Sequence, residues 1–156
     1  MAPTKLPELD HETERRLAAG LYNDVWRLME IPVRLPAQDD EMLHAAHASR
    51  YHWGKVGEPV NFARGEWICS RVYSVLGRPE PALWHARRCL ALLEESGGGE
   101  SWDLPAAYEA LARASYVAGD TAETERWIEM AHAALAAVTD ADDRKHIEDD
   151  LKTIAG

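Results

Sequence analysis

Residues 59–95 read PVNFARGEWICSRVYSVLGRPEPALWHARRCLALLEE, and this stretch decides the fold. Its apolar side chains recur every three or four residues, which predicts helices with one apolar face. Gly77 can adopt a left-handed backbone conformation without steric cost, so it ends the first helix. Pro79 suits the first turn of a second helix, in which the small residues Ala82 and Ala86 let two backbones approach closely. The stretch therefore predicts two antiparallel helices joined at Gly77.

A related pattern recurs on both sides of this pair. Gly119 ends another apolar stretch 42 residues after Gly77, and residues 26–31 and 42–53 give a fainter upstream copy. A fixed period of this size predicts stacked helical hairpins.

Capping residues extend the prediction to seven helices. Asp10, Asp39 or Asp40, Asp120, and Thr139 or Asp140 can each accept from the free N–H groups of a first helical turn. We expect helices at about 10–31, 39–54, 59–76, 79–95, 103–118, 120–138 and 140–154. In the last of these only Ile147, Leu151 and Ile154 form an apolar stripe, as expected of a helix that covers the end of an array.

Over about residues 12–138 the chain resembles the tetratricopeptide repeat family. The residues that match its motif are Tyr73, Gly77, Ala82 and Leu90 in the middle pair, and Tyr108, Leu111, Ala112, Gly119 and Ala131 in the last pair. The chain departs from the family in its longer period, against about 34 residues, and in Thr124 and Ala86, where the family has alanine and an aromatic residue. The resemblance implies an all-α, right-handed stack of about three antiparallel helical hairpins with a C-terminal capping helix.

Composition fits a single globular domain over residues 10–156. Residues 1–9 carry two prolines and no periodicity, so we expect a frayed terminus. The net charge is −10, which makes nucleic acid and anionic membranes poor partners. The chain shows neither a signal peptide nor an apolar run long enough to span a bilayer, which predicts a cytoplasmic protein. The two cysteines, Cys69 and Cys89, are predicted to be buried thiols.

The resemblance also implies where a partner would bind, because in tetratricopeptide arrays the first helix of each hairpin lines a concave groove. The first helix shows Asp24 and Arg27 on the face toward this groove, and the residues expected to bind a partner, on the third and fifth helices, are Arg64, Trp67, Arg71, Glu109, Arg113 and Tyr116. Arginine beside aromatic side chains suits an acidic or carboxylate-bearing peptide. We therefore expect replacement of Arg71 or Arg113 to weaken the binding of a partner while leaving the thermal stability of the protein nearly unchanged.

A second interpretation is a metal-binding helical protein. Glu41, His44 and His47 follow one another at three-residue spacing, and Glu129 and His132 repeat the Glu-x-x-His pattern. Two such pairs on different helices can build a di-metal site in a helical bundle. A three-hairpin stack would not bring these two helices together, so we expect no metal or other cofactor.

A third interpretation is a structural subunit that associates with copies of itself. The chain has no phosphate-binding Gly-x-x-x-x-Gly-Lys-Ser/Thr loop, Gly-x-Gly-x-x-Gly or Gly-x-Ser-x-Gly motif. His85, between Trp84 and two arginines, is expected on the surface. The sequence thus favours a non-enzymatic module that binds a protein or peptide, with metal binding and self-association as alternatives.

Overall fold

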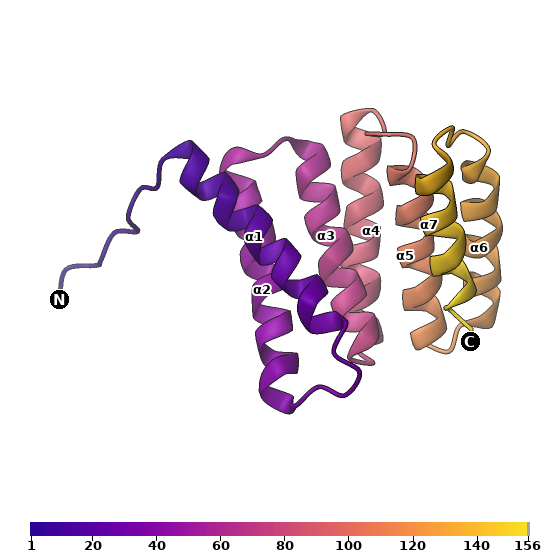
Figure 1. Cartoon of the computed structure of the whole chain (residues 1–156), viewed down its shortest axis with the longest axis horizontal. Helices are drawn as coiled ribbons and strands as arrows, with labels where there is room; N and C mark the ends of the chain where they lie inside the picture. The colour runs from indigo at the N-terminus through magenta and orange to yellow at the C-terminus, as the bar shows by residue number, and fades with distance from the viewer. Residues whose placement is uncertain (156) are drawn as a thin grey trace.

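The computed structural model describes residues 1–155, and all of its regular structure is helical (Figure 1). These residues form seven helices and no strand, which confirms the all-α prediction. The helices are α1 (His11–Met29), α2 (Pro36–Val56), α3 (Pro59–Val75), α4 (Pro79–Ser96), α5 (Asp103–Val117), α6 (Thr121–Leu135) and α7 (Ala141–Lys152).

The turn between α3 and α4 has the geometry that the sequence predicts. Gly77 has φ +69°, its N–H donates to the Ser74 carbonyl at 3.1 Å, and the N–H of Arg78 donates to the Tyr73 carbonyl at 2.8 Å. These are the two bonds of a Schellman motif, which requires a left-handed residue that glycine adopts most easily.

The turn between α5 and α6 repeats this arrangement. Gly119 has φ +74°, its N–H donates to the Tyr116 carbonyl at 2.9 Å, and that of Asp120 donates to the Ser115 carbonyl at 3.0 Å. Asp120 then caps α6 by accepting from the N–H of Glu123 at 3.1 Å. Two helix pairs therefore reverse direction by the same local chemistry.

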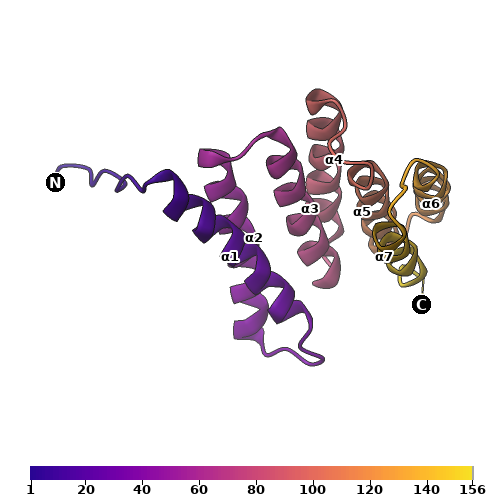
Figure 2. The same cartoon turned by 45° about the horizontal axis from the view of Figure 1, so that its top comes forward.

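Contacts between neighbouring helices build the core. α1 packs against α2, α3 against α4 and α5 against α6, and further contacts join α2 to α3, α4 to α5 and α3 to α5. Ala82 and Ala86 of α4 are fully buried, as their small size predicts. Figures 1 and 2 show α1 and α7 in front of the other helices, at opposite ends of the row.

Several boundaries and faces differ from prediction. α2 begins at Pro36, because the Gln38 side chain accepts from the N–H of Leu35, whereas Asp39 pairs with Arg34. α1 ends at Met29 and α6 at Leu135, a few residues early. The apolar side chains of Leu17 and Val75 are exposed.

Helix α7 covers α5 and α6 with one apolar face. Ile147, Leu151 and Ile154 are buried in a cluster with Leu135 and Val138 at the end of α6. Asp140 caps α7 by accepting from the N–H groups of Asp142 and Asp143, each at 2.9 Å.

The N-terminal segment contributes nothing to this core. Residues 1–10 have no regular secondary structure and are exposed. Residue 156, which the predicted domain includes, lies outside the described residues. Within residues 1–155, none of the helices combines the length and the apolar character that crossing a bilayer requires.

Candidate binding site

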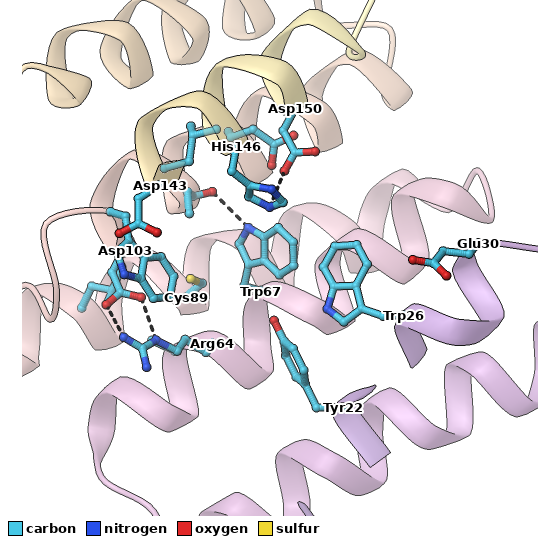
Figure 3. A pocket seen from close by; sticks show the side chains of 16 residues that line it. Tyr22, Trp26, Glu30, Arg64, Trp67, Cys89, Asp103, Asp143, His146 and Asp150 are labelled. Carbon is cyan, nitrogen blue, oxygen red and sulfur yellow. Dashed lines mark hydrogen bonds and ion pairs between the residues drawn. The ribbon is translucent and has the colours of Figure 1, made fainter. Parts of the chain in front are cut away.

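A cavity of about 480 Å³ is lined by side chains of α1, α3, α4, α5 and α7 (Figure 3). We call it the central cavity. Its lining residues are Tyr22, Trp26 and Glu30 of α1, Ala63, Arg64 and Trp67 of α3, Cys89 and Leu93 of α4, Trp102, Asp103, Ala106 and Glu109 at α5, and Asp143, His146, Ile147 and Asp150 of α7. This volume falls within the range of roughly 300–1,000 Å³ typical of ligand sites.

Aromatic rings form much of the cavity surface. Trp67 lies at its centre, with Trp26 and Tyr22 reaching toward it from α1 (Figure 3). The rings of Trp26 and Trp67 stack with centroids 5.8 Å apart. The indole N–H of Trp67 donates to the Ala106 carbonyl at 3.1 Å, which fixes the ring against α5. Rings fixed in this way offer a rigid apolar surface to a ligand.

Arg64 is bound by a carboxylate of the chain itself. Its Nε and one terminal nitrogen donate to the two oxygens of Asp103 at 2.9 and 2.8 Å, and its guanidinium carbon lies 4.4 Å from the centroid of the Trp102 ring. A carboxylate of a partner would need two neighbouring N–H donors of the guanidinium for such a two-pronged bond, and Asp103 already occupies two of them. Arg64 is therefore neutralised within the structure.

Arg71 and Arg113 share one buried carboxylate. Arg71 donates to Oε1 of Glu109 at 3.3 Å and to Asp150 of α7 at 3.0 Å. The Nε of Arg113 donates to the same Oε1 at 2.7 Å, and a terminal nitrogen donates to the Asp150 carbonyl and to Oγ1 of Thr153. These bonds tie α7 to α3 and α5.

The other oxygen of Glu109 has no such partner. Glu109 is only 1% exposed, and within residues 1–155 its Oε2 makes no hydrogen bond. Burial raises the pKa of this carboxyl, and Arg71 and Arg113 oppose that rise. A buried acceptor without a partner is costly, so a donor that entered the cavity and reached Oε2 would be stabilised there.

The charges around the central cavity do not cancel. Five carboxylates line it, those of Glu30, Asp103, Glu109, Asp143 and Asp150. Three arginines, Arg64, Arg71 and Arg113, pair with Asp103, Glu109 and Asp150. Glu30 and Asp143 have no ion pair among the described residues, which leaves an excess of two negative charges.

The structure brings together some of the predicted partner-binding residues. Arg64, Trp67 and Glu109 line the central cavity, whereas Arg71 and Arg113 lie beside it in internal ion pairs. Tyr116 does not line the cavity and is 51% exposed. The arginines thus already have carboxylate partners within the chain, and their binding to an external partner stays a prediction.

Sequence reasoning named Asp24 and Arg27 on α1, which pair with each other and do not line the cavity, and it missed the residues of α1 and α7 that do. Tyr22, Trp26 and Glu30 recur at four-residue spacing on one face of α1, and Asp143, His146 and Asp150 recur at spacings of three and four on one face of α7. The sequence shows that these residues share a helix face. It does not show which other helix that face contacts, because this depends on residues far apart in the sequence.

The residues of the metal-binding alternative lie far from one another. Glu41, His44 and His47 are on α2, whereas Glu129 and His132 are on α6, and these two helices make no contact. Within residues 1–155, no group of three or more histidine, cysteine or acidic side chains is placed to bind a metal ion.

A polar cluster occupies the interface of α2, α3 and α4. His47 shares a hydrogen bond with the Tyr73 hydroxyl at 2.8 Å, and His85 shares one with Glu66 at 2.6 Å. Arg50 donates to the other oxygen of Glu66 at 3.0 Å. The prediction that His85 lies on the surface is wrong: its side chain is 14% exposed, because the ring stacks on Tyr73 and bonds to the buried Glu66.

Both cysteines are buried free thiols, as predicted. Burial raises the pKa of Cys69 to about 12, because a thiolate would lose its hydration in the core. Burial raises the pKa of Cys89 for the same reason. Cys89 contributes an apolar surface to the floor of the central cavity.

Fold and cavity together define an all-helical protein with a ligand-sized, aromatic and acidic cavity. Comparison of the chain with family models, with curated proteins and with solved structures gives no match. The resemblance to tetratricopeptide repeats therefore rests on the residues quoted for it.

Proposed function

We propose that this chain is a non-enzymatic interaction module of tetratricopeptide-like architecture, and that it binds a segment of a partner protein in the central cavity. The observation that carries the proposal is the cavity itself, to which α1, α3, α4, α5 and α7 all contribute side chains. An open, aromatic-walled site built by several helices suits the side chains of an extended segment better than it suits a flat protein surface.

Two features support the architecture proposed. The pairs α3–α4 and α5–α6 turn at equivalent glycines with the same two hydrogen bonds, as expected of repeats. Helix α7 buries a single apolar stripe against α6, as expected of a capping helix. In such a stack α1, α3 and α5 would be the first helices of three hairpins, and all three line the cavity.

Selection from a library of displayed random peptides tests this function. We expect the wild-type protein to select peptides that the variant Ala106→Leu does not bind, because the larger side chain fills part of the cavity. Ala133→Leu, the same change on the exposed face of α6, is the matched control and should bind as the wild type does. If no peptide is selected, or if Ala106→Leu binds equally well, the central cavity is not a peptide site.

The cytoplasmic location and self-association stay predictions. Light scattering over a range of protein concentrations checks self-association directly.

A further inference from the structure

We propose that the central cavity recognises a positively charged side chain, arginine or lysine, of the partner segment. This inference rests on the proposed function and names the chemistry of the ligand. It also reverses the charge expected from the sequence, which favoured an acidic peptide.

The state of the arginines is the first argument. Each of Arg64, Arg71 and Arg113 donates to a carboxylate of the chain at 3.3 Å or less. An acidic ligand would have to displace these internal carboxylates, two of which, on Asp103 and Glu109, are nearly fully buried. Freeing a buried carboxylate from its partner is strongly unfavourable.

The remaining charge is the second argument. Glu30 of α1 and Asp143 of α7 lie on opposite sides of the cavity, and neither forms an ion pair among the described residues (Figure 3). The whole chain carries a net charge of −10, so its field also favours the approach of a cation.

The unpartnered oxygen of Glu109 is the third and independent argument. This atom is buried, belongs to a residue that lines the cavity, and has no donor within residues 1–155. An ammonium or guanidinium group supplies N–H donors and positive charge together. A cation that reached this oxygen would therefore satisfy a buried acceptor that has no donor within residues 1–155.

The aromatic walls suit the same ligand. The rings of Trp26, Trp67 and Tyr22 offer apolar surface to the methylene stem of a lysine or arginine and a negative face to its charged end. The chain already places its own guanidinium groups over two of the cavity's rings, with Arg64 at 4.4 Å from Trp102 and Arg71 at 5.6 Å from Trp67.

The test begins with the peptides selected from the random library. We expect an arginine or lysine to recur at one position of the selected peptides. A synthetic copy with citrulline, the uncharged analogue of arginine, at that position should bind about tenfold more weakly or worse, because it loses a charge-assisted contact. Affinity for the charged peptide should also fall as salt is raised.

Asp143→Asn and its neighbour Asp142→Asn form a matched pair in the first turn of α7. Asp143 lines the cavity, whereas Asp142 is exposed outside it. We expect Asp143→Asn to lower the affinity for the charged peptide by about fivefold, as for the loss of a partly exposed ion pair. The affinity for the citrulline peptide should hardly change. Asp142→Asn should bind both peptides as the wild type does.

The outcomes separate the inference from the function on which it rests. Selected peptides that require the cavity but lack a recurring basic residue, or that prefer acidic residues, would overturn the cationic site and leave the peptide-binding function standing. If no peptide is selected, but free arginine amide binds and Asp143→Asn weakens that binding, the ligand is a small free cation and not a peptide. Equal binding of the arginine and citrulline peptides would exclude recognition of charge.

Discussion

Small residues at the helix interfaces decide how closely the helices of this protein pack. Ala86 has no exposed surface and lies among Ala110, Leu111 and the partly buried rings of Trp67 and Trp127. Its environment has no room for a larger side chain unless α4 moves away from α5.

We expect Ala86→Leu to lower the free energy of unfolding by about 1–3 kcal/mol through overpacking. Urea unfolding followed by circular dichroism measures the change. Ala133→Leu adds the same atoms at an exposed position of α6 and should be close to neutral. A neutral result for Ala86→Leu would mean that this face of α4 is packed more loosely than the structure shows.

His47 makes stability depend on pH. Burial, chiefly, and the neighbouring His85 lower the pKa of its imidazole, and the opposing effect of Glu66 is smaller. The unfolded chain therefore binds a proton at this residue more readily than the folded protein does. Its contribution to stability is present above the ordinary histidine pKa of about 6.5, and it is lost as the pH falls below that value and through the lower pKa of the folded protein.

We expect the wild type to lose more stability than His47→Gln between pH 7.5 and pH 5.5, when both are unfolded in urea. His11→Gln, at the exposed start of α1, serves as the control and should follow the wild type. Parallel pH profiles for the wild type and His47→Gln would show that His47 does not contribute to this dependence.

Among the elements, α7 is held by hydrogen bonds and an ion pair as well as by its apolar stripe. Arg113 bonds to Glu109, to the Asp150 carbonyl and to Thr153, with its side chain only 14% exposed. Arg71 adds a bond from α3 to Asp150. The sequence suggested that these arginines could be replaced without loss of stability, but their internal bonds lead us to expect the opposite.

We expect Arg113→Met to lower the free energy of unfolding by about 3 kcal/mol, because the buried Glu109 loses a partner. Relative to the wild type, amide hydrogen exchange in this variant should speed up more in α7 than in α1 and α2. Arg126→Met removes an exposed arginine that pairs with Glu123 and lies over the Trp127 ring, and it should cost less than about 1 kcal/mol. Unchanged protection of α7 in Arg113→Met would show that its apolar stripe alone keeps it in place.

At the scale of the whole molecule, α3 connects the two ends. It contacts α1, α2, α4 and α5, and its Arg71 reaches α7. An array in which helices touched only their chain neighbours could unfold from either end. Here the central helix couples the ends, which favours a single cooperative transition.

We expect urea unfolding curves from far-ultraviolet circular dichroism and from tryptophan fluorescence to coincide. Three of the six tryptophans, Trp26, Trp67 and Trp102, line the central cavity, so the fluorescence reports in large part on this region, whereas the dichroism reports on all helices. An early fluorescence transition would mean that the cavity opens before the helices melt.

The local structure could be read largely from the sequence, because it depends on neighbouring residues. Gly77 and Gly119 end helices where only a left-handed residue allows the Schellman bonds, and Asp10, Asp120 and Asp140 cap helices through N–H groups two or three residues away. The start of α2 was misplaced because Gln38 and Asp39 compete as partners, and the outcome depends on Arg34.

The candidate binding site was decided only by the tertiary structure. Arg64 meets Asp103 across 39 residues, and Arg71 meets Asp150 across 79. From the sequence these arginines were equally suited to a partner's carboxylate, since spacing shows which face of a helix a residue shares but not which helix covers that face. α5 supplied Asp103 and Glu109 and α7 supplied Asp150 as partners of these arginines, and Glu30 of α1 and Asp143 of α7 add the unpaired acidic charge of the central cavity.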